Sequence, residues 1–493
     1  MSFPASKVPM FRQSWRFPRE FFTCRQCLQN QSVILRTPRQ WLGTAPFRKP
    51  LRLNSIISQT GRWRNTNSTL RSISQAATEA GPVAKSRFPN VSSKIVAYWL
   101  LGSAASVFGI VVFGGLTRLT ESGLSITEWR PVTGSLPPMN AEDWESEFAK
   151  YRDSPEFQIL NPHMTLAEFK NIYYMEWIHR IWGRFVGLSF VIPAIYFVAT
   201  KRLSKPMALR LGGIAGLIGF QGFLGWWMVK SGLKDDLFAP GSHPRVSQYR
   251  LTAHLGAAFV CYAAMLWNGL AILRQHRLLA DTEKGLIMLD SLRDPKLNIF
   301  RRSVAGLALL VFITAMSGGL VAGLDAGLIY NEFPTMGTGF APPKSELFDP
   351  HYSRKPDRSD LWWRNMLENP SLVQLNHRIL AMTTFCSVMG LWAYSKYSPT
   401  MKRLLPQVAR KGVHGVVAFA MVQVGLGIST LLYLVPIHLA SAHQAGSLFL
   451  LTWVLVLGNR IWHPSRTARL LQMAAKARGT SIPRAPSPLT KKP

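Results

Sequence analysis

Cysteine is scarce in this chain, and so are acidic residues. Only four Cys occur among 493 residues. Cys24 and Cys27 form a C-x-x-C near the N-terminus, whereas Cys261 and Cys386 stand alone in apolar stretches, where we expect them to pack as small apolar side chains. This pattern predicts no disulfide framework and no Cys-based metal site. An Asp-rich N-D-x-x-D motif is missing as well, which argues against Mg²⁺-dependent transfer of a polyprenyl group.

The excess of basic over acidic residues is large, with 57 Lys and Arg against 25 Asp and Glu. It is unevenly distributed, because residues 1–80 contain 11 Arg and 2 Lys but only two acids, Glu20 and Glu79. An Arg-rich, Ser-rich and acid-poor start is typical of a mitochondrial transit peptide, so we assign residues 1–85 to one. The alternative is a basic tail that binds RNA; the membrane segments that follow argue against it, and we expect no nucleic-acid partner.

Long apolar runs provide the main structural signal. Each has about the 20 residues that a helix needs to cross a hydrocarbon core of roughly 30 Å. They lie near 95–116, 181–200, 208–229, 251–273, 303–324, 374–395, 412–435 and 437–459. The sequence therefore predicts an all-α membrane protein with eight transmembrane helices.

The two halves of this membrane region resemble each other. GGLTRLTESGL at 114–124 aligns with GGLVAGLDAGL at 318–328, and QGFLG at 221–225 with QVGLG at 423–427. Four spans restore the original orientation, so the repeat predicts two pseudo-symmetric four-helix bundles. We place them at 92–272 and 303–462, joined by a linker at 273–302 and followed by a disordered basic tail at 463–493.

The charge of the connections predicts their sidedness. Residues 201–210, 274–302, 396–411 and the segment after Arg460 are rich in Lys and Arg, whereas the long connections 117–170 and 325–370 carry more acid than base. By the positive-inside rule, the termini face the mitochondrial matrix and the long loops face the intermembrane space. This topology is that of a multi-pass inner-membrane protein.

Four histidines occupy matching positions in the two halves. His179 in MEWIHR corresponds to His377 in VQLNHR, and His254 in RLTAHLG to His443 in ASAHQAG. All four are predicted near the intermembrane-space ends of their helices. Ionisable residues inside a membrane are rare and usually functional, and paired His on facing helices can hold a flat metal macrocycle. We expect one haem-sized ligand in each half; hydrogen bonding between helices is the alternative for a single His.

Two neighbours of these histidines are chemically informative. Three residues before His179 stands Glu176, whereas Gln374 stands at the matching position before His377. A carboxylate can accept a proton, so acid–base chemistry is predicted in the N-terminal half alone, unless Glu176 is an interfacial charge. Arg180 and Arg378 follow the histidines and are candidates for pairing with haem propionates, or for anchoring at the interface. His438, five residues before His443, stays open as an alternative ligand.

These residues resemble the haem A synthase family in its mitochondrial form. The resemblance covers about residues 92–462. It is carried by long strings: GGLTRLTESGLSITEWRPVTGSLPP at 114–138, MEWIHRIWGR at 175–184, QYRLTAHLG at 248–256, GLDAGLIYNEFPTMG at 323–337, QLNHR at 374–378 and AHQ at 442–444. Some bacterial members carry a Cys pair in the first outer loop; residues 117–170 contain none, so a mechanism that uses that disulfide does not transfer.

The resemblance implies an oxidoreductase that converts haem O to haem A. The C8 methyl group is hydroxylated twice, through the alcohol haem I, and loss of water leaves a formyl group used in assembling cytochrome c oxidase. Carried over by position, His179 and His254 bracket the substrate haem, His377 and His443 ligate a resident haem B, and Glu176 is the essential carboxylate. A ferredoxin with its reductase, the haem O synthase and a second copy of the chain are the partners that the family suggests.

Two other functions fit the histidine pairs. A bis-haem cytochrome that only transfers electrons would have the same ligands but no use for the difference between Glu176 and Gln374. A haem transporter or chaperone would bind haem without turnover. Identification of the haems bound to the purified protein separates these hypotheses, since haem O, haem I or haem A beside haem B supports the enzyme.

Overall fold

The structure is a computed structural model that describes residues 88–238 and 243–477. The regular elements in these ranges are helices, and one isolated β-bridge joins Met336 to Gly339. The predicted transit peptide, including Cys24 and Cys27, lies outside the described residues, and so does the end of the predicted tail.

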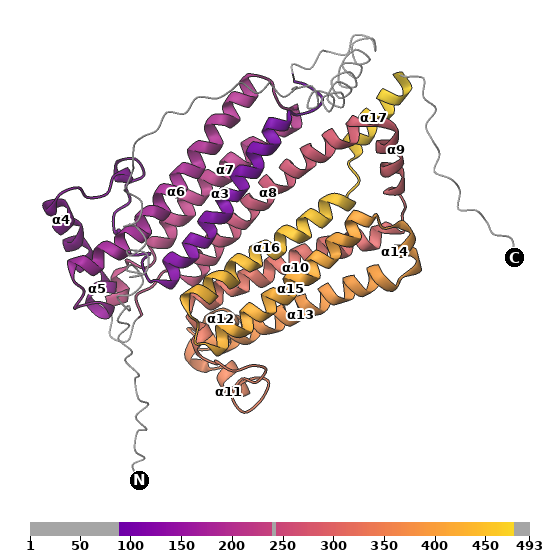
Figure 1. Ribbon diagram of the computed structural model, residues 1–493. Helices are drawn as coiled ribbons and strands as arrows, with labels where there is room; N and C mark the ends of the chain where they lie inside the picture. Colours follow the sequence, from indigo (N-terminus) through magenta and orange to yellow (C-terminus); the bar gives the residue numbers. More distant parts are fainter. Residues whose placement is uncertain (1–87, 239–242, 478–493) are drawn as a thin grey trace, which may run out of the picture. The chain divides into compact units, whose positions relative to one another are not determined.

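Eight long helices form the body of the described chain (Figure 1). The first half contributes α3 (Lys94–Leu119), α6 (Leu166–Ala199), α7 (Lys205–Val229) and α8 (Gln248–Ala280). The second half contributes α10 (Leu297–Gly323), α13 (Pro370–Tyr397), α15 (Gln407–Leu432) and α16 (Ile437–Ile461). All eight apolar runs of the sequence thus lie in helices.

Seven of the described segments are long and apolar enough to cross a membrane, which confirms an all-α membrane protein. They are α3, α6, α7, α8, α10, α15 and the segment Ile437–Ala477 that contains α16. The remaining long helix, α13, has 28 residues but is not among them. Its first turns carry Gln374, Asn376, His377 and Arg378, which dilute its apolar content.

Local signals fix where these helices begin. Thr165 and Glu168 form a capping box, in which each side chain accepts a hydrogen bond from the other residue's backbone N–H. This cap starts α6 at Leu166, well before the apolar run at 181. The side chain of Asn369 accepts from the Ser371 N–H, and Pro370 occupies the first helical position of α13.

The two halves meet along four of these helices. α3 packs on α8 within the first half, and α10 packs on α16 within the second. Across the halves, α8 packs on α10 and α16 on α3. Glycines permit the close approach: Gly319 of α10 lies against Thr252 of α8, and Gly115 of α3 lies against Gln444 of α16.

One end of the helices carries the two long connections, and we call it the long-loop end. The first connection contains η4 (Thr133–Ser135), α4 (Ala141–Arg152) and α5 (Pro155–Leu160). An aromatic core of its own, formed by Trp144, Phe148, Tyr151, Phe169 and Tyr173, holds it onto the start of α6. The second contains η6 (Ala326–Leu328), α11 (Lys344–Leu347), η7 (Pro350–Tyr352) and α12 (Leu361–Glu368).

At the opposite end of the helices, the structure differs from the predicted layout in two places. The predicted disordered tail is wrong for Ser465–Ala477, which form helix α17, because an apolar side with Leu470 and Leu471 is buried against α9. The predicted linker 273–302 is largely helical, since α8 continues to Ala280, α9 covers Thr282–Ser291 and α10 begins at Leu297. The short helix α14 (Pro399–Leu404) lies between α13 and α15.

Candidate functional site

The four matching histidines all lie at the long-loop end, one on each of four helices. His179 lies on α6 and His254 in the second turn of α8, while His377 and His443 lie in the second turns of α13 and α16. His179 is deeper in its helix only because the capping box extends α6. All four imidazoles are half-buried, and the Nδ1 atoms of His179, His254 and His443 are buried.

Each of these rings packs on a glycine of a neighbouring helix. A Cβ atom at any of the four glycines would come within 3.4 Å or less of the imidazole Cε1. The pairs are Gly114 with His179, Gly225 with His254, Gly318 with His377 and Gly427 with His443. The glycine backbone therefore approaches the Cε1 atom of each ring, which lies between the two ring nitrogens.

In the second half the two rings lie close together, edge to face. The centroids of His377 and His443 are 6.4 Å apart, and the ring planes are perpendicular. A metal–imidazole bond is about 2 Å long, so two rings on opposite sides of one metal ion, each adding its half-width, fit this separation. His438 is exposed in the first turn of α16, and the ring opposite His377 is that of His443.

In the first half, His179 packs on Gly114 of α3 and His254 on Gly225 of α7, and α3 packs on α8. The same hydrogen bond occurs in both halves and reaches the backbone of the second histidine of each pair. The Gln221 side-chain amide donates to the His254 carbonyl at 3.1 Å, and that of Gln423 donates to the His443 carbonyl at 2.9 Å. Gln221 thus joins α7 to the backbone of His254 on α8, and Gln423 joins α15 to the backbone of His443 on α16.

Glu176 is buried, with 3% of its surface exposed, and each of its two carboxylate oxygens accepts two hydrogen bonds. One carboxylate oxygen accepts from the Ser125 hydroxyl at 2.7 Å and the Ile126 N–H at 2.8 Å. The other accepts from Nε and Nη2 of Arg180, at 3.0 and 2.6 Å. This charged pair holds the first long loop against α6, one turn from His179.

Gln374 and Arg378 form the corresponding clamp in the second half. The Gln374 amide and Nη2 of Arg378 both donate to the Tyr330 carbonyl, at 2.9 and 3.0 Å. Nη1 of Arg378 donates to the Thr335 carbonyl at 2.9 Å. In both halves these side chains hold a long loop against a helix. The halves differ in that this side chain is a carboxylate in Glu176 and an amide in Gln374.

Arg180 also lines two cavities. Its guanidinium donates to the carbonyls of Ile126 and Glu128, at 2.8 and 3.1 Å. A cavity of about 350 Å³ on one side is lined by Arg180, Arg184, Arg130 and Lys150 among others. A second cavity of about 300 Å³ is lined by Arg180, Lys230, Trp129 and Trp226 among others. Both cavities are also lined by Glu128, and the first by Asp143 and Glu147, so their linings are mixed in charge. The guanidinium and ammonium groups among them suit carboxylates.

The first long loop contains a buried acid that the sequence analysis did not single out. Glu156, at the start of α5, is 4% exposed, and its Oε2 atom has no hydrogen-bond partner. Burial, reinforced by the charges of Glu121 and Glu176, raises the pKa of Glu156 from its ordinary value of 4.5 to about 8. Burial also raises the pKa of the neighbouring Tyr151.

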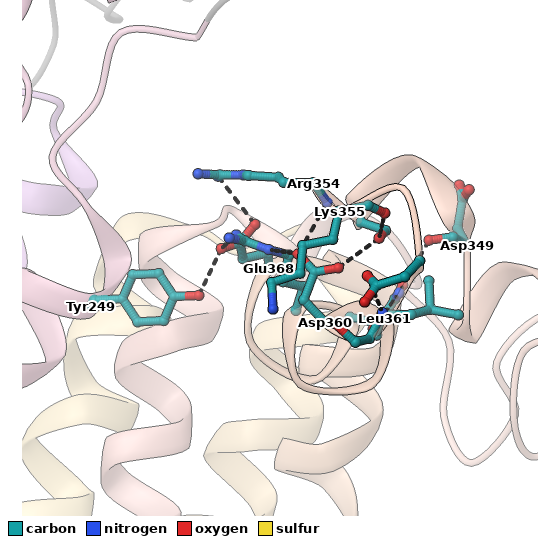
Figure 2. Close-up of polar contacts among 12 residues, drawn as sticks. Tyr249, Asp349, Arg354, Lys355, Asp360, Leu361 and Glu368 are labelled. Carbon is teal, nitrogen blue, oxygen red and sulfur yellow. Dashed lines mark hydrogen bonds and ion pairs between the residues drawn. The ribbon is translucent and has the colours of Figure 1, made fainter.

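Polar contacts at the long-loop end join the two halves. Arg118, at the end of α3, pairs with Asp325 after α10 at 2.8 Å, and Arg245 adds a second contact to Asp325 at 3.3 Å. Figure 2 shows another link, in which the Tyr249 hydroxyl at the start of α8 donates to Glu368 at the end of α12, at 2.9 Å.

The polar cluster in Figure 2 organises the loop around α12. Arg364 pairs with Asp360 at 2.6 Å and with Glu368 at 2.8 Å. Hydrogen bonds from the Ser353 hydroxyl and Arg364 hold the pKa of Asp360 well below its ordinary value. This loop is therefore held by contacts of Arg364 with two acids, and one of these, Glu368, reaches the first half through Tyr249.

The sequence analysis missed several residues that shape the site. The four glycines behind the histidines were visible as repeated Gly positions, and Ser317, whose hydroxyl lies 2.7 Å from Nδ1 of His377, precedes one of them. Ser125 and Ile126, by contrast, belong to an irregular loop without periodicity, and no pattern marks them as partners of Glu176.

Comparisons with known proteins agree with this geometry. The family model COX15-CtaA, described as a cytochrome oxidase assembly protein, matches residues 97–455. "Heme A synthase COX15" of Saccharomyces cerevisiae is 52% identical over 394 residues, 80% of each chain. "Heme A synthase COX15" of Homo sapiens is 45% identical over 391 residues, 79% of this chain and 88% of the relative. A Schizosaccharomyces pombe "Heme A synthase-mitochondrial ferredoxin fusion protein" is 48% identical over 459 residues, 92% of this chain and 71% of the relative.

Proposed function

This chain belongs to the haem A synthase family, and from that membership we propose how its residues carry out the reaction. The activity is that of an oxidoreductase, which oxidises a methyl group of haem O to a formyl group. The protein is a mitochondrial multi-pass membrane protein.

The proposed topology has eight spans, with α13 as the sixth, in two pseudo-symmetric four-helix bundles. The support is that each bundle repeats the same histidine, glycine and glutamine contacts on corresponding helices. The proposed setting is the inner membrane, with both termini in the matrix, a transit peptide within residues 1–85, and the histidines toward the intermembrane space.

His179 and His254 bracket the substrate haem O in this proposal, and His377 and His443 hold a resident haem B. The ring separation of 6.4 Å in the second half fits a metal between His377 and His443. When bound there, haem B supplies a one-electron carrier close to the substrate site. The histidines orient the two groups, and the surrounding apolar helices provide a medium in which haem O dissolves.

Glu176 is the proposed catalytic carboxylate. Each oxidation of the methyl group releases protons as well as electrons, and Glu176 lies one helical turn from His179. A proton on Glu176 would weaken its pair with Arg180, and with it the hold on Ser125 and Ile126. Proton transfer at the substrate and the position of the first long loop are therefore coupled in this mechanism.

Arg180 and Arg378 are the proposed partners of haem propionates. For Arg180 the support is its place in the lining of two cavities, the first of which it shares with Arg184 and the second with Lys230. For Arg378 the support is its repeat-equivalent position and a buried Nε atom without a hydrogen-bond partner. A propionate would join contacts that both arginines already make to loop carbonyls.

The electron partner is proposed to be a ferredoxin with its reductase. The support is the relative whose name joins a haem A synthase to a mitochondrial ferredoxin in one chain. Direct transfer of haem O from the enzyme that makes it is proposed because this apolar haem is poorly soluble, and association with a second copy of the chain belongs to the same proposal.

The observation that carries the function is the repeated pairing of histidines with one chemical difference between the halves, Glu176 against Gln374. The test is to purify the protein from its membrane, extract the haems and identify them by chromatography and mass. Haem B together with haem O, its alcohol or haem A is expected. Haem B alone, with no turnover of added haem O, would make the chain an electron-transfer cytochrome.

A further inference from the structure

One ligand of the second half has a hydrogen-bond partner on its ring. The Ser317 hydroxyl of α10 lies 2.7 Å from Nδ1 of His377 on α13. Ser317 directly precedes Gly318, which packs on the same imidazole. α10 therefore contacts this ring with both a glycine backbone and a hydroxyl group.

The direction of this hydrogen bond follows from the one proton that a hydroxyl carries. The Ser317 O–H donates to the Thr314 carbonyl at 2.7 Å, and a carbonyl can only accept. The Ser317 oxygen then accepts the Nδ1–H of His377, whose ring also has the Thr314 carbonyl as a neighbour. In the neutral imidazole the other nitrogen, Nε2, is left without a proton and free to bind a metal ion.

The other half lacks this arrangement. Alignment of Gly114 with Gly318 makes Phe113 the counterpart of Ser317, and Nδ1 of His179 is buried without a hydrogen-bond partner. The difference extends further, because Thr314 and Thr384 share a hydroxyl contact of 2.8 Å. Their counterparts in the first half are the apolar residues Ile110 and Val186.

The remaining two histidines resemble His179 in this respect. The Nδ1 atoms of His254 and His443 are buried and have no side-chain hydrogen-bond partner, and the polar neighbour of the His443 ring is the backbone of Gln423. Within the described residues, His377 is thus the one histidine of the four whose Nδ1 is held by a side chain. A hydrogen bond at Nδ1 fixes the orientation of a ligand ring and makes the opposite nitrogen a stronger donor to the metal.

We propose that Ser317 is a positioning residue that anchors His377, retains the haem of the second half and lowers its reduction potential. The inference rests on the proposed function, which assigns haem B to His377 and His443. A stronger nitrogen donor favours the ferric over the ferrous state, so the potential falls. The first half has no such anchor at His179, which suits a site that must release its haem as product.

The test compares full-length, haem-loaded wild-type protein with Ser317→Ala. Two quantities are measured: the reduction potential of haem B, by potentiometric titration, and the rate at which haem B passes to an excess of apomyoglobin. Loss of such outer hydrogen bonds weakens metal binding about 10–100-fold, so haem B should leave faster by a similar factor. A tenfold loss confined to the ferric state corresponds to an upward shift of about 59 mV.

Three further variants make the result specific. Ser317→Thr keeps a hydroxyl and should restore both values toward wild type, whereas Ser317→Cys, a weaker acceptor, should fall between wild type and Ser317→Ala. Ser447→Ala is the matched control, because the Ser447 hydroxyl on α16, the helix of His443, also donates to the carbonyl three residues before it, that of Gln444. It should leave potential and haem retention unchanged.

The outcomes separate this inference from the proposed function. Unchanged potential and retention in Ser317→Ala and Ser317→Cys, with loss of haem B from His377→Ala, would overturn the role of Ser317 and leave the haem site intact. Full retention of haem B by His377→Ala would instead remove the proposed site. If Ser317→Ala does not fold, the other two variants decide the question. A higher reduction potential in Ser317→Cys than in wild type and Ser317→Thr supports the role of Ser317, and equal potentials in all three contradict it.

Discussion

Glu176 and Arg180 form a buried ion pair of 2.6 Å, one turn apart on α6 and directly beside His179. The same carboxylate also binds Ser125 and Ile126 of the first long loop. A carboxylate that both holds a loop and lies next to a haem ligand can act structurally or chemically. Variants that break the loop contact without removing the charge distinguish the two.

Glu176→Gln is predicted to abolish most haem A synthesis, with haem O or its alcohol accumulating. General acid–base roles contribute about 10²–10⁴-fold to a rate, so a loss in this range is expected while both haem sites stay filled. Turnover and the haem content of purified protein are the measurements. The amide cannot copy all four contacts of the carboxylate, because its NH₂ group must face another donor.

Ser125→Ala is the control for that structural effect. It removes one loop contact of Glu176 but leaves the carboxylate and its pair with Arg180. We expect a loss of less than tenfold if Glu176 acts on a proton. Equal losses in Ser125→Ala and Glu176→Gln would assign Glu176 to holding the loop.

His377→Ala and His443→Ala should each remove most of the bound haem B, because each deletes one of two opposed ligands. The optical spectrum of the reduced protein and extracted haem B per chain measure this. His438→Ala is the matched variant, since this exposed residue lies on the same helix as His443. If both His377→Ala and His443→Ala kept a full complement of low-spin haem B while His438→Ala lost it, His377 and His443 would not be the ligands and His438 would be one.

Much of the fold was predictable because membrane helices have a strong signal. All eight apolar runs lie in helices, since each can bury a helix's length of side chains in hydrocarbon. The early start of α6 was also readable, as Thr165 and Glu168 have the spacing of a capping box. Helix α17 was missed because its basic residues hide a short apolar side that includes Leu470.

The site was predictable only where the repeat made it visible. The matching contexts of His179 and His377 single them out from the other histidines, and the exchange of Glu176 for Gln374 follows from the same alignment. Contacts across the halves, such as Arg118 with Asp325, could not be predicted. Arg118 and Asp325 are 207 residues apart, and Asp325 lies in an irregular turn after α10, where no pattern indicates its partner.

Gly427→Ala is predicted to disturb the second haem site without unfolding the protein. The new Cβ would come within 2.8 Å of Cε1 of His443, so the ring must move from its position opposite His377. We expect loss or spectral change of haem B amounting to tenfold weaker retention or more, by the scale on which misplaced ligand contacts act. The apomyoglobin transfer rate measures it.

Gly425→Ala provides the control two residues away on the same helix. No heavy atom beyond the helix's own backbone lies within 4 Å of its added Cβ. Replacing Gly by Ala inside a helix stabilises it by roughly 0.5–1 kcal/mol, so this variant should keep haem B and melt at the same or a higher temperature. Similar haem loss in both variants would show that α15 tolerates no Cβ for a reason other than contact with His443.

Glu156 is predicted to make stability depend on pH. Its pKa is about 8 in the folded protein against an ordinary value of 4.5, so between these values the folded state holds a proton that the unfolded state has released. Stability from this group is therefore fully present below about pH 4.5 and is lost as the pH rises to 8, with a slope of up to about 1.4 kcal/mol per pH unit. Glu156→Gln removes the dependence, so the melting temperature of the variant should exceed that of wild type by more at pH 8 than at pH 5.5.

Glu142 is an exposed acid of the same loop, so Glu142→Gln should leave the wild-type pH profile unchanged. A difference between Glu156→Gln and wild type that is equal at both pH values would mean that Glu156 is already ionised in the folded protein, with a partner for its Oε2 atom.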